Sequence, residues 1–218
     1  MADYTFNDFT YKEPGVRKMH GRLAGVRGEF GLNLFAGLGV SVGGEYADGH
    51  LNFTELTPGA SARTRLTHDY FRQTQGLIHF VYGSMVVAAG MAERYWYNHL
   101  EDSNRRRTRY NYTPIFFTYR AGPIYLKLEH DIWNKGWHKS HMSDVNPVAT
   151  DIEFKLGKGT GSGAELGYRI AGMVTSRIFI SYHKWDVKDS DVQSDGTQNY
   201  IESKNSVTEI KGGIGLAF

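Results

Sequence analysis

Hydrophobic and polar residues alternate one by one over much of the chain. In residues 124–133, IYLKLEHDIW, four even-numbered positions are aliphatic and three odd-numbered positions carry a charge. The segments 34–46 and 164–170 repeat this period of two. Successive side chains of a strand point to opposite faces, whereas a helix would spread the same residues around its circumference. The pattern therefore predicts β-strands with one apolar face and one polar face.

Turn residues and polar stretches divide the chain into ten predicted strands. The strands are expected at residues 4–12, 18–30, 34–46, 68–82, 85–98, 108–120, 124–133, 151–171, 177–186 and 201–218. Tight turns are expected at 31–33, 83–84, 121–123 and 172–176, and long polar connections at 13–18, 47–67, 99–107, 134–150 and 187–200. Because the two kinds of connection alternate, we expect antiparallel neighbours, with both termini at the short-turn end and the long loops at the other.

Two predicted strands depart from the regular pattern. In the first, Tyr4, Phe6 and Phe9 do not share one parity. Without this strand and one other, eight strands would remain as the alternative to ten. In the segment 108–120, Pro114 lacks the N–H group that a strand ladder uses, so a bulge or local irregularity is expected there.

The apolar face could pack inside a soluble sandwich or meet lipid on the outside of a barrel. The sorting of loop lengths by end favours the barrel, and so do aromatic residues near the ends of the apolar face, where membrane barrels carry girdles. These residues are Phe30, Tyr46, Phe80, Tyr82, Tyr119, Tyr168 and Phe218. No run approaches the roughly 18 to 20 apolar residues of a spanning helix. We predict an all-β fold in one domain, residues 1–218: a closed antiparallel up-and-down transmembrane β-barrel.

The last ten residues, EIKGGIGLAF, place Ile210, Ile214, Leu216 and Phe218 at alternate positions. This ending resembles the C-terminal strand signature of Gram-negative outer-membrane barrels, which their insertion machinery recognises. The resemblance implies a location in the bacterial outer membrane, with outer-membrane lipid, lipopolysaccharide and the insertion machinery as partners. Residues 1–8 lack the basic segment and apolar core of an export signal, so we expect that the signal has been removed.

Charged residues recur on the parity opposite to the aliphatic one, which predicts a charged barrel interior. The predicted interior charges are Arg27, Glu29, Glu45, Lys127, Glu129, Asp131, Glu165, Arg169, Glu209 and Lys211. A barrel of eight to ten strands is narrow enough for side chains to fill it, and charges taken out of water must pair or change protonation. We expect a mixed-sign network that braces the barrel. A hydrated passage for ions or small solutes and a buried proton relay are the alternatives.

The ten-strand layout also resembles that of the omptin outer-membrane proteases, whose active site lies at the extracellular rim and uses paired aspartates with an Asp/His couple. Three histidine–aspartate pairs that are close in this sequence join residues of opposite parity: His68 with Asp69, His130 with Asp131, and His183 with Asp186. Neighbouring strand residues point to opposite faces, so none of these three pairs converges by local geometry. We find no counterpart of the omptin motifs and predict no catalytic residue.

Three further features are expected to belong to the loops or the membrane interface. His138, His141 and Asp144 have a spacing that could bind a divalent metal, but a hydrated loop is the expected role. The run RRRTR at 105–109 suits the phosphates of lipopolysaccharide, with a solvated charge cluster as the favoured alternative. The four tryptophans are predicted to anchor the barrel at the outer interface: Trp96, Trp133, Trp137 and Trp185.

Composition narrows the function further. The chain has no cysteine, which excludes disulfides, thiol nucleophiles and thiolate metal sites. Its formal charge of +2 is too small to indicate nucleic-acid binding. We predict a non-enzymatic surface or binding protein of the outer membrane with long extracellular loops, no cofactor and no metal, whose extracellular ligand the sequence does not identify. A narrow channel and an omptin-like hydrolase at the rim are the alternatives.

Overall fold

The computed structural model describes residues 1–56, 64–100, 105–194 and 198–217. Most of them form strands: β1 (Ala2–Glu13), β2 (Arg17–Phe35), β3 (Leu38–Glu55), β4 (Thr64–Tyr82), β5 (Met85–Leu100), β6 (Arg106–Ala121), β7 (Ile124–Ser140), β8 (Ile152–Lys155), β9 (Gly159–Ile170), β10 (Thr175–Val187), β11 (Gln193–Ser194), β12 (Asn199–Tyr200) and β13 (Asn205–Ala217). One short 3-10 helix, η1 (Met142–Asp144), follows β7. Within the described residues there is no helix of the length and apolarity needed to cross a membrane.

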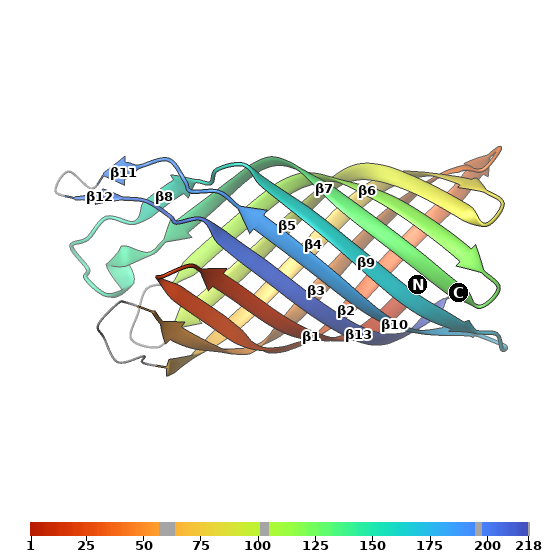
Figure 1. Cartoon of the computed structure of the whole chain (residues 1–218), viewed down its shortest axis with the longest axis horizontal. Coiled ribbons are helices and arrows are strands. Elements are labelled where there is room, and N and C mark those ends of the chain that lie inside the picture. Colours follow the sequence, from red (N-terminus) through yellow and green to blue (C-terminus); the bar gives the residue numbers. More distant parts are fainter. Residues whose placement is uncertain (57–63, 101–104, 195–197, 218) are drawn as a thin grey trace.

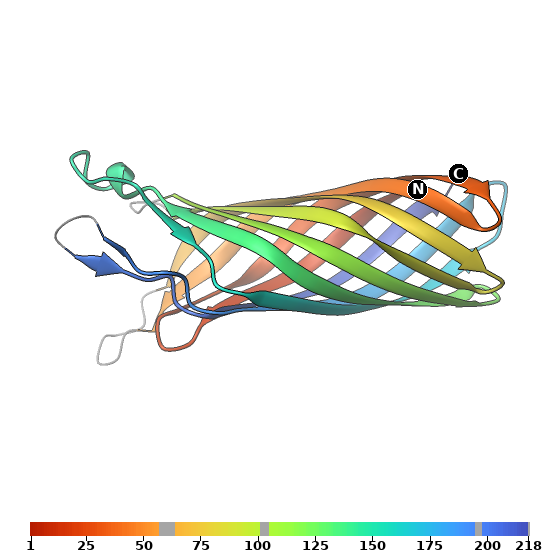
Figure 2. The same cartoon turned by 90° about the horizontal axis from the view of Figure 1, so that it is seen from above.

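The strands form one closed antiparallel sheet. β1 pairs with both β2 and β13, and β6 pairs with both β5 and β7, so the ring of β1 to β7, β9, β10 and β13 has no open edge. Figures 1 and 2 show this ring as an elongated barrel of tilted strands. The prediction of a closed ten-stranded barrel is confirmed, and the eight-stranded alternative and the stacked sandwich are wrong. β8 pairs with β7 beyond the end of β9, so residues 156–158 interrupt the predicted strand 151–171.

Tight turns lie at the end of the barrel that carries both termini (Figure 1). The first of them is at Ala36–Gly37, not at 31–33 as predicted. Both turn residues have positive φ, 48° and 83°, which is what a two-residue hairpin turn with a twist matching its strands requires. Glycine adopts this conformation without steric cost, so Gly37 sets the turn and the strand continues through the predicted turn region.

At the other end, several predicted loops are shorter than expected. β3 continues to Glu55, β7 continues to Ser140, and β1 and β2 are joined by only three residues, 14–16. The predicted loops 13–18, 47–67 and 134–150 are therefore partly strand. The hydrogen-bonded ladder extends past the region where outward-facing residues are apolar, so hydrophobic alternation ends before the strands do.

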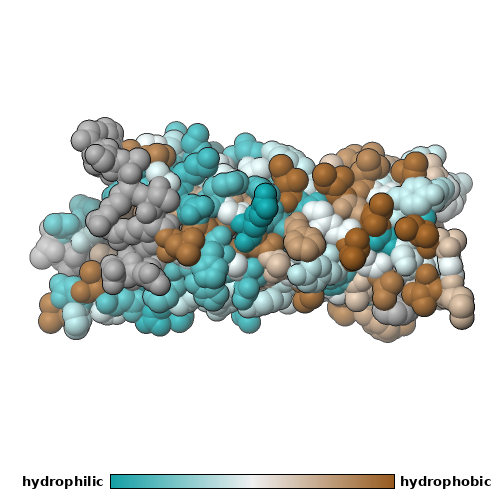
Figure 3. All heavy atoms as spheres, turned by 90° about the horizontal axis from the view of Figure 1, so that it is seen from below, coloured by the Kyte–Doolittle hydropathy of each residue, from teal (hydrophilic) through white to brown (hydrophobic). Residues whose placement is uncertain are grey.

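On the face seen in Figure 3, apolar side chains gather over the half of the barrel near the termini, while the long-loop half is mostly hydrophilic. Every barrel strand contributes to an apolar belt, with side chains that are 39–64% exposed: Phe6, Val26, Phe30, Val42, Ile78, Phe80, Val87, Ile115, Phe117, Leu126, Leu128, Leu166, Ile178, Ile180, Ile210 and Ile214. The aliphatic parity thus faces outward, as predicted. Phe218, the last residue of the predicted C-terminal signature, lies outside the described residues.

The irregularity predicted near Pro114 is present. The ladder between β5 and β6 omits the pairs opposite Thr113 and Pro114. On the other side of β6, Asn111 pairs with Lys135 and Tyr112 with Trp133, so Asn134 is an extra residue in β7. This bulge reverses the parity of β7 beyond it, and His138 faces inward although it is even-numbered.

Candidate functional site in the barrel lumen

The predicted interior charges lie on the lumen side of the barrel wall. Nine of them line one cavity of about 540 Å³, and Asp131 lies buried beside it. The cavity reaches the end with the termini, because Met1 and Asn33 are among its lining residues. In the described part of the chain these charges do not form one continuous chain of contacts. Seven of them gather into three groups, Lys127 and Arg169 lie over the rings of Phe116 and Tyr125, and Glu29 lines the cavity outside the groups.

The first group joins Arg27 and Glu165 across the cavity, with Nη1 2.9 Å from Oε2. Arg27 also donates from Nε to Asp3 over 2.8 Å, and Asp3 in turn accepts from Arg177 over 2.8 Å. The hydroxyl of Tyr125 donates to Glu165 over 2.7 Å. Asp3 and Arg177 were not predicted, although both share the inward parity of their strands. Asp3 lies just before the first predicted strand, whose weak pattern hid its parity, and Arg177 is the first residue of the predicted strand 177–186.

The second group is a cluster of buried ion pairs in the lumen. The Glu209 carboxylate pairs with Arg94, and its other oxygen lies 3.2 Å from Lys211 Nζ. Lys211 also lies 2.7 Å from Glu45. The guanidinium of Arg94 lies 4.6 Å from the ring centre of Phe71. Arg94 was missed in the sequence, although it shares the parity of the inward-facing alanines of β5.

An apolar plug fills the lumen on the long-loop side of these charges. It consists of fifteen buried side chains drawn from most strands of the barrel: Phe9, Tyr11, Met19, Leu23, Ala47, Leu51, Phe71, Ala92, Trp96, Tyr110, Tyr112, Leu156, Trp185, Val187 and Val207. Trp185 lies near its centre, 4.7 Å from the ring of Tyr112 and 6.0 Å from that of Tyr110. Aromatic packing of this kind fills much of this part of the lumen with side chains.

The plug corrects the prediction for the tryptophans. Trp96 and Trp185 are buried in it and Trp133 packs against it, so these three do not anchor at the membrane interface. Only Trp137 has the outward-facing position, between Arg109 and Lys135. The physical reason is parity: Trp96 shares the lumen face with Arg94, and a narrow barrel without a central helix must fill its interior with its own large side chains.

A separate charged cluster lies at the long-loop end of the barrel, beyond the plug. Glu202, from the segment between β12 and β13, lies 3.1 Å from Arg17 and accepts from the Tyr11 hydroxyl over 3.2 Å. Arg17 Nε donates to Glu13 over 2.6 Å, and His138 Nε2 lies 3.8 Å from Glu202. These five residues form the rim cluster, which ties the last long loop to the strand ends. Burial, followed by repulsion from Glu202, raises the pKa of Glu13 to about 7.

From the raised pKa of Glu13 we predict that the free energy of unfolding decreases as the pH rises from about 4.5 to about 7. In this range the folded chain keeps a proton on Glu13 that the unfolded chain releases. Glu13→Gln mimics the protonated form. We expect the variant to lose this decrease, so that its stability relative to the native chain rises by roughly 1–3 kcal/mol between about pH 5 and about pH 8. Urea unfolding followed by tryptophan fluorescence measures this. Parallel pH profiles for the two proteins would contradict the assignment.

The side chains of the candidate metal site, His138, His141 and Asp144, do not converge on one point. His138 points into the lumen and shares a hydrogen bond of 2.9 Å with Thr108. His141 lies 2.8 Å from Asp151, and Asp144 pairs instead with Arg105 of the RRRTR run. The spacing of the three residues therefore describes a strand end and a loop in which each side chain has a different partner.

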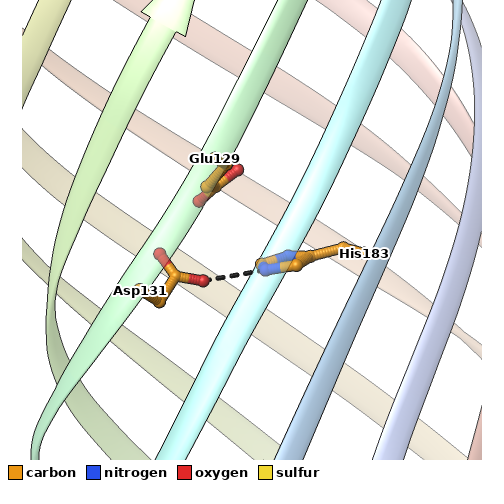
Figure 4. Close-up of side chains that lie close together, drawn as sticks. All are labelled: Glu129, Asp131 and His183. Carbon is orange, nitrogen blue, oxygen red and sulfur yellow. Dashed lines mark hydrogen bonds and ion pairs between the residues drawn. The ribbon is translucent and has the colours of Figure 1, made fainter.

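A third lumen group, Glu129, Asp131 and His183, was not found from the sequence. His183 comes from β10 and reaches across β9 to the two carboxylates of β7 (Figure 4). His183 Nε2 lies 2.8 Å from Asp131 Oδ2, and one ligand atom from each of the three residues lies within 4.8 Å of the others. His183 thus meets Asp131 across 52 residues, and its partner is not the Asp186 that lies close to it in the sequence.

The fold was compared with those of solved structures. The structure is similar to that of the outer-membrane protease OmpT from Escherichia coli, with a TM-score of 0.61 and 11% sequence identity over 100% of this chain and 96% of that chain. The fold is that of an outer-membrane β-barrel. Weaker likenesses to this barrel are the β domain of the Bordetella autotransporter BrkA (TM-score 0.41, 10% identity, covering 100% and 98%) and the P. putida toluene transporter TodX (0.40, 6%, 98% and 87%).

The likeness to OmpT concerns the barrel fold alone, because only 11% of the aligned residues are identical. No protein-family model matches the chain, and no curated protein matches its sequence. The omptin-like layout predicted above is thus supported as a distant structural likeness, and it brings no catalytic residues with it.

Proposed function

We propose that this chain is an integral protein of the bacterial outer membrane that binds ligands or partners and does not conduct solutes. The observation that carries this proposal is the division of the lumen into an apolar plug on the long-loop side and a charged cavity on the side of the termini. A channel needs a continuous polar path through the lumen. The apolar plug supports the proposal that this barrel has no such path.

The apolar belt supports the membrane location. On β2, the outward-facing side chains change from the polar His20 and Arg22 to the apolar series that begins at Ala24 and ends at Leu34. This length agrees with the roughly 9–11 residues that a tilted strand needs to cross the hydrocarbon core. Closure of the sheet leaves no open edge whose backbone groups would face lipid unpaired. In this arrangement the termini lie on the periplasmic side and the long loops outside. Removal of an export signal stays a prediction.

The outward face between the belt and the long loops supports lipopolysaccharide as a partner. Tyr70 stacks on Tyr97 with ring centres 4.8 Å apart, and the guanidinium of Arg72 lies 5.1 Å from the ring of Tyr95. Arg107, from the RRRTR run, is exposed on the adjacent strand β6. Arginine binds phosphate through a planar fork and tyrosine suits the membrane interface. Recognition by the insertion machinery stays a prediction that rests on the C-terminal pattern.

The rim-located hydrolase has less support. Such an enzyme would need acidic side chains that converge on an accessible histidine at the rim, whereas His138, Glu202 and Glu13 of the rim cluster are all buried. His141 and Asp151 do lie together in a loop, but the carboxylate of Asp151 also accepts a hydrogen bond of 2.7 Å from Ser143. The next acidic residue, Asp144, is paired with Arg105. The described rim residues are therefore engaged with one another.

Planar-bilayer recording tests the proposal. The native chain, folded in detergent and inserted into the bilayer, is expected to give no stepwise conductance, because the plug separates the charged cavity from the outer solution. A porin inserted from the same detergent serves as the positive control. Slower migration of the sample on a detergent gel after boiling shows that the inserted protein was folded. Regular conductance steps from the native chain would overturn the proposal and favour the channel alternative.

A further inference from the structure

We propose that Glu129, Asp131 and His183 bind a divalent transition-metal ion, of which Zn²⁺ is the best match. The three side chains offer one imidazole nitrogen and two carboxylates, and their ligand atoms lie within 4.8 Å of one another. An ion about 2.0–2.2 Å from each ligand would set these atoms roughly 3–4 Å apart. The side chains must move closer to reach that geometry, and Glu129 and His183 are only partly buried.

An unpartnered buried carboxylate oxygen points to a cation at this place. The side chain of Asp131 is 0% exposed, and its Oδ1 atom has no hydrogen-bond partner in the described part of the chain. Leaving a buried acceptor unpaired is unfavourable, and more so for a charged group. Among the described residues, neither Glu129 nor Asp131 has a lysine or arginine within ion-pair distance. A bound metal ion would supply the missing positive charge.

The strand between the ligands has the small residues that the cluster needs. β9 separates β7 from β10, and its Gly161 and Gly163 lie opposite Asp131 and His183. A Cβ atom at Gly161 would lie 2.4 Å from Asp131 Oδ2, and one at Gly163 would lie 3.1 Å from the His183 ring. Any larger residue at Gly161 would displace the carboxylate. The glycines therefore let side chains from two non-adjacent strands meet over the strand between them, as Figure 4 shows.

The cluster is open to the charged cavity on one side and bordered by the apolar plug on the other. Glu129 and His183 line the charged cavity, so an ion can enter from the end with the termini. On the other side, the ring of Trp185 lies 5.2 Å from that of His183 and belongs to the apolar plug. Mixed imidazole and carboxylate donors favour first-row ions such as Zn²⁺ over Ca²⁺ or Mg²⁺, which prefer oxygen ligands alone.

Calorimetric titration of the full, folded chain in detergent with zinc chloride tests this site. We expect one saturable site for the native protein. His183→Ala and Glu129→Gln should each weaken its affinity at least about tenfold, since the first removes one of three protein ligands and the second replaces a charged carboxylate ligand with a neutral amide oxygen. Glu129→Gln is the conservative variant, and faster migration of unboiled samples on a detergent gel shows that both variants fold. Excess Ca²⁺ should not displace the zinc.

Two matched controls separate this site from other histidines. His79→Ala removes another histidine of the same cavity, one that is hydrogen-bonded to Asn33. His68→Ala removes an exposed histidine whose ring lies 5.5 Å from that of His50 on the outer wall. Both variants should bind zinc as the native chain does. No saturable binding, unchanged affinity in His183→Ala, loss of binding in His68→Ala, or displacement by Ca²⁺ would each overturn the proposal. Because the titration needs neither a bilayer nor a known location, its result is independent of the proposed function.

Discussion

Glu209→Gln is expected to lower the free energy of unfolding by about 3–5 kcal/mol, because it removes one partner of a buried ion pair. The Glu209 side chain is 1% exposed and that of Arg94 is 2% exposed. Arg94 has no other carboxylate within ion-pair distance among the described residues. Glutamine preserves the shape of glutamate, so the change isolates the charge. Urea unfolding of the refolded barrel, followed by tryptophan fluorescence, measures the difference.

An exposed pair on the same part of the wall provides the matched control. Arg109 and Glu93 also form a glutamate–arginine pair, but their side chains are half and about a quarter exposed. Glu93→Gln should cost less than about 1 kcal/mol, because solvent screens the pair. Adding Arg94→Met to Glu209→Gln should recover much of the lost stability, since no uncompensated charge then remains buried. If Glu209→Gln and Glu93→Gln cost the same, burial does not govern the strength of these pairs.

Trp185→Ala is expected to destabilise the barrel by about 3–5 kcal/mol, the usual cost of truncating a fully buried tryptophan. Its ring is 0% exposed and contacts Tyr110, Tyr112 and Trp133 in the apolar plug. Removal of the ring leaves a cavity that the rigid barrel wall cannot close. The same unfolding measurement applies, and loss of near-ultraviolet circular dichroism would report the loosened aromatic packing.

Trp137 is the natural control for Trp185. It faces outward between Arg109 and Lys135, at ring distances of 5.6 and 5.0 Å. Trp137→Ala loses mainly these cation–π contacts, so we expect a cost of about 1 kcal/mol or less. Equal costs for the two substitutions would mean that the plug adds little to stability, and would weaken the argument that it closes the lumen.

The faces of the strands could be predicted from the sequence because the period of two depends only on local backbone geometry. Leu126 and Ile214 face outward and Glu129 and Glu209 face the lumen, whatever their neighbours are. The extent of the strands could not be predicted in the same way. Beyond the apolar belt, outward positions become polar, and the strand then looks like a loop although its ladder continues, as in β3 between residues 47 and 55.

Contacts inside the lumen depend on register and closure, which a single sequence does not contain. Arg27 meets Glu165 across 138 residues, and His183 meets Asp131 across 52. The bulge at Asn134 reverses the parity of the rest of β7, so the inward position of His138 could not be derived by counting. The tryptophans were misplaced for a related reason: strands that extend beyond lipid have an interior there, and large rings fill it.

The barrel strands continue beyond the apolar belt and form a rigid extension of the barrel toward the long loops. On β2, residues 17–23 continue the strand past the apolar series, which corresponds to a projection of roughly 15–20 Å above the hydrocarbon for a tilted strand. Loops that join the ends of these extended strands start from fixed positions well clear of the lipid surface. A partner that docks there would lose less binding free energy to ordering the chain than one that meets loops on flexible tethers.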